Sequence, residues 1–230
     1  MRTDRATKLA RVTAEVVACR ACPRLVVWRE KVAVDKRAAF ADEDYWGRPV
    51  PSFGDPGARL LVVGLAPAAH GGNRTGRVFT GDRSGDWLFA SMYRTGWTNQ
   101  PVSKHADDGL ELYGAFIAAV VRCAPPLNKP TTDERDRCLP YLVRELELLT
   151  EVRVIVTLGS FGWDGALRAL AQLGTEIPRP KPRFGHLAEV TVGHHTLIGS
   201  YHPSQQNTFT GKLTEEMLDA VFVRAHELSD

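Results

Sequence analysis

The sequence predicts an α/β protein in which helices cover both faces of a mainly parallel sheet. Short apolar runs that suit buried strands alternate with helical patterns, and loops follow these runs near residues 64, 123, 159 and 202. Such alternation is typical of strand–helix–strand units, whose buried parallel strands read as continuous apolar runs. Because 43% of the 230 residues are hydrophobic, the chain can bury one sizeable core. We therefore expect a single domain over residues 1–230.

The first half of the chain contains two expected helices and two expected strands. Residues 5–18 have an amphipathic helical pattern, and RLLVVG at 59–64 reads as a buried strand. Ser84 to Thr95 reads as a helix that ends at Gly96. The run at 115–122 fits a strand or a helix by periodicity alone, but its brevity and its abrupt end before two prolines favour a strand.

The second half continues the alternation. Thr131 and Glu134 form a capping box in front of a helix that extends to about Leu149 and that Pro140 is expected to disturb. The remaining expected elements are a strand at 153–159, a helix at 160–174, two β segments within 185–204, and a closing helix at 214–228 that Thr214 caps.

A glycine-rich loop, GLAPAAHGGNRTGR at 64–77, follows the first buried strand. Ligands of open α/β sheets bind beyond the carboxyl ends of the strands, and glycines there let the backbone approach a ligand closely. The loop has neither the GxxxxGK[ST] nor the GxGxxG spacing, so it is not a common phosphate cradle.

The net charge of +2 is small, but the charge is unevenly distributed. Residues 1–40 hold ten Lys or Arg against four acids, whereas residues 213–230 hold five acids and one Arg. These ends are compatible with two solvated helix faces, and the basic end also permits a polyanionic partner such as nucleic acid. The charged N-terminus lacks a signal-peptide pattern, and no apolar run approaches the roughly 20 residues of a membrane span. We expect an intracellular, cytoplasmic protein.

Four cysteines suggest a metal centre. Cys19 and Cys22 form a CxxC pair, and Cys123 and Cys138 follow about a hundred residues downstream. Disulfides are rare in the cytosol, and four thiolates suit either zinc or an iron–sulfur cluster. Four ordinary thiols are the alternative.

Several separated motifs resemble one known family. GLAPA (64–68), HGGNRTGRVFTGDRSG (70–85), RCAPPLNKP (122–130) and HPSQQNTFTGKLT (202–214) resemble the uracil-DNA glycosylase superfamily, specifically its iron–sulfur family 5, or type B. The cysteines resemble the cluster ligands of families 4 and 5. The similarity extends in order from Cys19 to Thr214.

The resemblance implies a three-layer α/β/α sandwich with a four-stranded, mainly parallel sheet and a [4Fe–4S] cluster, with zinc as the less favoured metal. It implies a DNA repair enzyme of base excision, a monomer that hydrolyses the N-glycosidic bond of a deaminated base in double- or single-stranded DNA and leaves an abasic site. The expected substrate-binding residues come from three loops: Gly64, Leu65, Ala66, Pro67 and Ala68, then Phe79, then Ser204, Gln205 and Asn207.

Three residues are the candidates for catalysis. In related families an acid or amide early in the first loop handles water, but Leu65, Ala66 and Pro67 stand there in this chain, a departure typical of family 5. Asp82 is then the nearest carboxylate, although it also suits a helix cap. His202 is placed to donate a hydrogen bond to the departing base, and Asn128 to pair with a base edge or simply to form a turn.

Two other protein classes compete with a glycosylase. A zinc- or iron–sulfur-stapled nucleic-acid-binding protein explains the cysteines and the basic N-terminus, but it leaves GLAPA and HPSQQN without a purpose. An iron–sulfur electron carrier also explains the cysteines, yet such ligands usually cluster more tightly in the sequence.

Overall fold

One six-stranded sheet runs through the computed structural model, which describes residues 2–229. Its strands, in chain order, are β1 (Phe53–Gly54), β2 (Leu60–Gly64), β3 (Ala115–Ala119), β4 (Val154–Leu158), β5 (Glu189–Val192) and β6 (His195–Ser200). They lie side by side in the order β1-β3-β2-β4-β6-β5. The four central strands are parallel, whereas β1 and β5 pair antiparallel at the two edges. The predicted four-stranded sheet therefore corresponds to the centre of a larger one.

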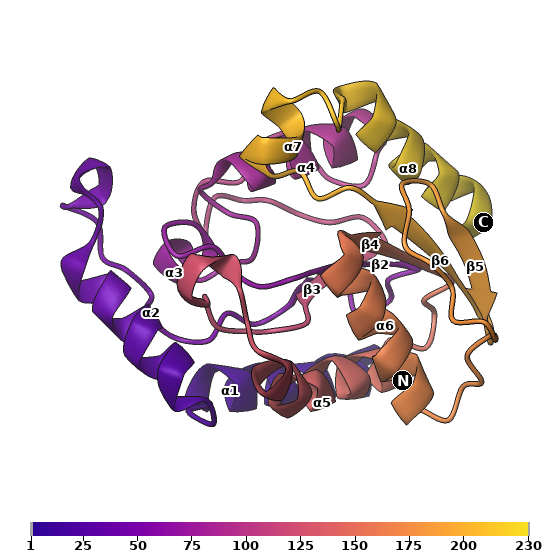
Figure 1. The fold of residues 1–230 in the computed structure, drawn as a ribbon, viewed down its shortest axis with the longest axis horizontal. Helices are drawn as coiled ribbons and strands as arrows, with labels where there is room; N and C mark the ends of the chain where they lie inside the picture. Colours follow the sequence, from indigo (N-terminus) through magenta and orange to yellow (C-terminus); the bar gives the residue numbers. More distant parts are fainter. Residues whose placement is uncertain (1, 230) are drawn as a thin grey trace.

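Helices surround this sheet (Figure 1). They are α1 (Arg2–Ala18), α2 (Pro23–Asp35), α3 (Gly72–Thr75), α4 (Arg83–Arg94), α5 (Thr132–Leu148), α6 (Ser160–Gln172), α7 (Gln205–Phe209) and α8 (Glu215–Ser229), with 3-10 turns η1 (Ala38–Phe40) and η2 (Pro126–Asn128). Among the described residues, no helix has both the length and the apolar character needed to cross a bilayer.

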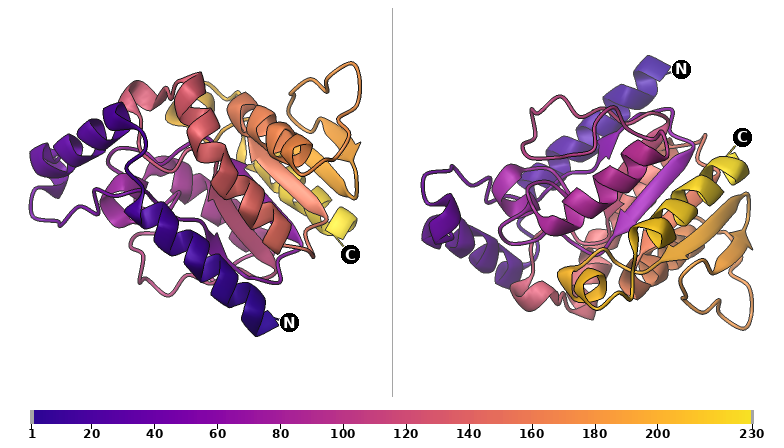
Figure 2. Two further views of the ribbon diagram at one scale, coloured as in Figure 1. Left: turned by 90° about the horizontal axis from the view of Figure 1, so that it is seen from below. Right: turned by 90° about the horizontal axis from the view of Figure 1, so that it is seen from above.

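The sheet separates two hydrophobic cores, which confirms the three-layer prediction. Alternate residues of β2 point to opposite faces, so Leu61 and Val63 join one core while Leu60 and Val62 join the other. Helices α1, α5 and α6 lie over the first core, and α4 and α8 over the second (Figures 1 and 2). Helix α2 projects away from the sheet at the left of Figure 1.

Local sequence signals explain where most helices begin and end. The capping box of Thr131 and Glu134 forms as predicted, and Thr214 accepts a hydrogen bond from the backbone of Met217 at 3.2 Å. Gly96 takes the left-handed φ of +81° after α4. In contrast to the expected disturbance, α5 continues through Pro140.

Three helices lie in segments for which the sequence predicted no helix, and the shortest is α3, a single turn within the glycine-rich loop. Helix α2 begins at Pro23, directly after Cys22, where a proline at the first helical position is favourable. The polar run after His202, expected to be a loop, contains the short helix α7, whose N-cap is Ser204. Polar composition hid this helix because its stability comes from a cap rather than from a buried face.

The order of the strands predicts where a ligand binds. After β2 the chain adds β3 on one side of it and then β4 on the other, so the loops after β2 and β4 leave the sheet in opposite directions. A crevice at such a switch point, beyond the carboxyl ends of the strands, is the usual ligand position in open α/β sheets. The loop from Gly64 to Ala68 begins there.

Candidate active site

The glycines of the first loop make room for a second loop. A Cβ atom on Gly64 would lie 2.7 Å from Cζ of Phe79, and one on Gly71 would overlap the carboxylate of Asp82. Distances this short are essentially never seen for real Cβ atoms. The glycines of this loop therefore make room for the side chains of Phe79 and Asp82. The sequence predicted only that they let the backbone approach a ligand.

Phe79 occupies a strained position between the two loops. Its φ of +53° lies in the left-handed region, which is uncommon for a bulky residue and is maintained only when the surrounding structure enforces it. The ring is 9% exposed, and its centroid lies 6.0 Å from that of His202 at an interplanar angle of 36°. The structure thus brings together Gly64, Phe79 and His202, which are far apart in the sequence.

Asp82 is both a helix cap and a wall of a cavity. One carboxylate oxygen accepts a hydrogen bond from the backbone N–H of Gly85 at 3.0 Å, which caps α4. Burial raises the pKa of Asp82 above its usual value, although hydrogen bonds from the backbone of Gly85 and Ser84 oppose that rise. The residue also lines an open cavity of about 610 Å³. The two roles that the sequence left open are therefore compatible.

The same cavity collects residues from several loops. Ala68, Asp82, Asn128 and Gln205, all predicted for the site, line it together. Asn128 is exposed on η2 with a φ of +55°, a conformation that asparagine tolerates well. Of the other predicted residues, Leu65 and Ala66 are half-buried and Pro67 is buried, and none of the three lines the cavity.

His202 lies just after the end of β6, and its imidazole ring is uncharged at neutral pH. Removal from water lowers its pKa to about 4, so the ring carries one N–H and no charge at neutral pH. The loop after it is fixed locally: the Asn207 side chain donates to the carbonyl of His202 at 2.8 Å, and Ser204 caps α7. Two of the predicted substrate-binding residues, Ser204 and Asn207, therefore hold the loop that carries the imidazole.

One wall of the cavity was not predicted. Arg37 and Phe40, around η1, line it together with residues of the glycine-rich loop. Phe40 lies under the guanidinium of Arg74 at 3.9 Å, and Tyr45 shares a hydrogen bond of 3.0 Å with His70, which also lines the cavity. The sequence signalled Arg37 only as part of a basic stretch, because contacts between residues so far apart leave no local pattern.

The four cysteines meet in a second cavity. Cys19 and Cys22 lie at the junction of α1 and α2, Cys123 follows β3, and Cys138 is on α5; all four line the same space. Buried Arg29 donates to Cys123 Sγ at 2.9 Å, and the backbone N–H of Arg122 donates to Cys138 Sγ at 3.2 Å.

The charge in this cavity is unbalanced. Burial raises the pKa of Cys123 to about 11 and that of Cys138 to about 12, so both thiols are neutral as they stand. Arg29 is 2% exposed, and its nearest carboxylate oxygen, on Glu30, lies 3.9 Å away, beyond hydrogen-bonding distance. A buried cation without a close anion is costly. The cavity therefore suits a group that makes its thiols negative.

The comparisons agree with the resemblance seen in the motifs. The family model described as "Uracil DNA glycosylase superfamily" matches residues 51–225. A protein of Mycobacterium tuberculosis named "Type-5 uracil-DNA glycosylase" is 55% identical over 226 residues, covering 97% of this chain and 83% of that protein. A protein of the same name from Thermus thermophilus is 49% identical over 214 residues, covering 93% and 95%.

A type-4 protein is more distantly similar to this chain than the type-5 proteins are. A "Type-4 uracil-DNA glycosylase" of Pyrobaculum aerophilum is 29% identical over 163 residues, which is 70% of this chain and 74% of that protein. The type-5 proteins match nearly the whole chain at far higher identity. The chain belongs to the uracil-DNA glycosylase superfamily, and within it to the type-5 group.

Proposed function

We propose that this protein is a monofunctional DNA glycosylase that flips a deaminated base out of DNA and hydrolyses its N-glycosidic bond. One observation carries the proposal: Asp82 and Asn128 line one cavity, and Phe79 beside Asp82 packs against the His202 ring. The cavity thus presents a carboxylate and an amide to an extruded nucleotide. Phe79 and His202 do not line the cavity themselves, and they supply an aromatic ring and a neutral imidazole packed against each other. The family names of the relatives support uracil as a substrate.

Base flipping requires a stacking surface and a group that replaces the base in the duplex. Phe79 supports the first role because its ring is held between Gly64 and His202. Phe209 on α7 supports the second, since its side chain is 66% exposed and the Arg83 guanidinium lies 4.7 Å from the ring centroid. Apolar side chains that fill base steps are a common device of proteins that distort duplexes. We assign α7 to the DNA groove.

Bond cleavage produces a cationic sugar and an anionic base. A neutral imidazole has one N–H to donate, and His202 is in that state at neutral pH because its pKa is about 4. Its donor would strengthen as charge gathers on a carbonyl oxygen of the base, which favours the transition state over the bound substrate.

Asp82 and Asn128 serve the other half of the reaction. The carboxylate of Asp82 would stabilise the cationic sugar or orient the water that attacks it, in the place of the acid that the first loop lacks. The side-chain amide of Asn128, with both donors and acceptors, would pair with the base edge. An amide that can present either face suits more than one base, so we include hypoxanthine and xanthine among the substrates.

We further propose that the four cysteines hold a [4Fe–4S] cluster. A cluster with four thiolates carries negative charge, which would neutralise Arg29. Among residues 2–229, no three Cys, His, Asp or Glu gather closely enough to hold a single metal ion. The proposal therefore rests on the cavity that the four cysteines share and on the motif resemblance. When bound, the cluster would supply a structural link between the α1–α2 junction, the segment after β3, and α5. No step of the base-removal chemistry involves it.

The proposed partner is DNA, bound by the protein as a monomer in the cytoplasm. The four thiols are free of disulfides, which suits a reducing compartment. Arg37 and Arg83 are exposed at the rim of the cavity, where phosphates of a flipped nucleotide would lie.

Duplex affinity should fall as salt rises, because phosphate contacts release counterions. Replacing one phosphate-binding cation, as in Arg83→Gln, should reduce the slope of log affinity against log salt by about 1. The measurement is fluorescence anisotropy of a labelled duplex between low and moderate salt. Affinity that does not change with salt contradicts the assigned DNA face.

A single assay tests the function itself. Duplexes that differ in one base, uracil, hypoxanthine, xanthine or thymine, are incubated with excess protein and then treated with alkali. We expect cleavage at uracil and at the deaminated purines, and none at thymine. Binding without alkali-labile sites would instead support a nucleic-acid-binding protein that lacks glycosylase activity.

A further inference from the structure

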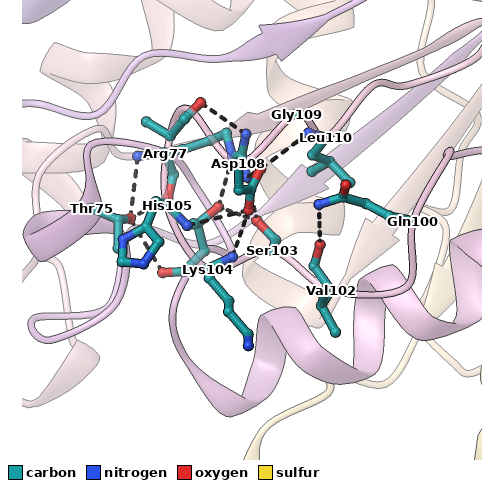
Figure 3. Close-up of polar contacts among 12 residues, drawn as sticks. Thr75, Arg77, Gln100, Val102, Ser103, Lys104, His105, Asp108, Gly109 and Leu110 are labelled. Carbon is teal, nitrogen blue, oxygen red and sulfur yellow. Dashed lines mark hydrogen bonds and ion pairs between the residues drawn. The ribbon is translucent and has the colours of Figure 1, made fainter.

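The side chain of a buried arginine, Arg77, donates four hydrogen bonds and belongs to the polar network of Figure 3. Arg77 is 7% exposed and donates to Thr80 Oγ1 at 3.0 Å, Ser103 Oγ at 2.8 Å, the carbonyl of Ala106 at 3.0 Å and Asp108 Oδ1 at 2.6 Å. A planar guanidinium that donates to several fixed acceptors restrains all of them at once. Neither Arg77 nor Asp108 lines the cavity.

Asp108 is also held by hydrogen bonds from the backbone of its own loop. Its carboxylate accepts backbone hydrogen bonds from Lys104 at 2.7 Å, His105 at 3.2 Å and Leu110 at 3.1 Å. With the hydrogen bonds of Ser103, they make residues 103–110 a compact loop built around Asp108. The ion pair therefore joins the segment that follows the glycine-rich loop to a preformed support.

The restrained segment carries the residues that the proposed reaction needs. Thr80 shares a hydrogen bond of 2.6 Å with Ser103, and the N–H of Gly81 donates to the carbonyl of Ser103 at 2.8 Å. Phe79, with its φ of +53°, lies between Arg77 and Thr80, and Asp82 follows directly after Gly81. Strain of this kind is maintained only where neighbours on both sides are held.

We infer that Arg77 and Asp108 are positioning residues, whose ion pair holds Phe79 in its left-handed conformation and so places the stacking ring beside His202. The inference rests on the proposed function for its consequence on rate, but its structural content is independent of that function. Loss of the pair should release Phe79 from Gly64 while the cavity-lining side chains remain in place.

The test measures rate and active fraction separately. Asp108→Asn keeps the size of the side chain and removes its charge, and Arg77→Lys keeps the charge and loses the planar fork; the second variant carries the test if the first does not fold. We expect the single-turnover rate constant on uracil duplex to fall about tenfold or more, since misplacing a group by about 1 Å costs up to about a hundredfold. Reaction amplitude and duplex affinity should stay within about twofold.

A matched control separates positioning from general stability. Asp219→Asn breaks the ion pair with Arg94, at 2.7 Å, that joins α8 to α4 away from the cavity. It should lower the melting temperature without changing the rate constant. If Asp108→Asn only lowers the amplitude and leaves the rate constant at the wild-type value, the pair is merely structural and the inference is overturned.

A double-mutant cycle and a crystal structure complete the test. If the pair acts through Phe79, adding Asp108→Asn to Phe79→Leu should reduce the rate little beyond Phe79→Leu alone, whereas additive losses contradict the inference. A crystal structure of Asp108→Asn should show Phe79 outside the left-handed region or displaced from Gly64. If Phe79 has not moved in that structure, the inference is overturned, whether or not the wild type acts on uracil. A wild type that is inactive on uracil contradicts only the proposed function.

Discussion

At the scale of single residues, the protonation state of His202 decides what it can do. With a pKa of about 4, the imidazole cannot act as a cationic acid at neutral pH, so we expect it to act as a hydrogen-bond donor to developing charge. His202→Ala should lower the single-turnover rate on uracil duplex by about a hundredfold, the usual effect of removing one such donor. Binding of intact damaged DNA should hardly change. Equal losses in rate and affinity would show that His202 contributes to substrate binding instead.

If Asp82 is catalytic as proposed, we expect the rate to depend on pH. Its pKa is raised by burial, so the carboxylate is protonated at a higher pH than an exposed aspartate. If the ionised form is needed, the rate reaches its maximum at pH values above that raised pKa and falls as the pH drops through it. Asp82→Asn keeps an acceptor for the α4 cap, and it should lower the plateau and remove the acid limb of the rate–pH profile. A profile that keeps both plateau and limb assigns Asp82 to capping alone.

At the scale of elements, the contact between Gly71 and Asp82 can be tested from the glycine side. A methyl group at Gly71 would occupy the position of the carboxylate, so Gly71→Ala should displace Asp82 and reduce the rate about as much as Asp82→Asn does. Gly185→Ala is the control, because its new Cβ would meet Ala188 at an ordinary 3.5 Å. Equal rates for the two alanine variants would mean that the loops move apart without consequence.

The elements show which parts of this molecule a sequence can predict. Strand β5, the four central strands and helices α1, α4, α5, α6 and α8 were predicted because each has a buried face, an alternating pattern or a cap that can be read locally. Strand β1 has two residues, too few for any pattern. Helix α2 exposes Val27 and Val34 and buries Arg29, so its apolar pattern does not mark its buried face.

The site followed the same rule. Asp82, Asn128 and Gln205 were predicted from motifs and do share a cavity. The support behind them was not predicted, because Arg77 and Asp108 are separated by 31 residues, and nothing near either one indicates the other. Long-range polar contacts depend on the completed fold.

At the scale of the whole molecule, the cysteine cavity lies where the α1–α2 junction, the segment after β3 and α5 meet. A group bound by Cys19, Cys22, Cys123 and Cys138 would close a loop of about a hundred residues and restrict the unfolded chain. Cys138→Ala should therefore lower solubility together with the brown absorption and the iron and sulfide content. A soluble, colourless and fully active variant would contradict the structural role of the cysteines. Zinc in place of iron in the purified protein would contradict the cluster.

The mutual fit of the first two loops constrains how this protein can be altered, by natural selection or by design. Gly64 leaves space that only the Phe79 ring fills, and Gly71 leaves space for the Asp82 carboxylate. A larger residue in one loop requires a compensating loss in the other, so we expect single changes here to reduce activity. Residues 64–85 and the supporting loop at 103–110 depend on each other, so the sequences of both segments have to be changed together. We therefore expect changes aimed at a new base preference to be better tolerated at Asn128 or Arg37, which line the cavity from outside these segments.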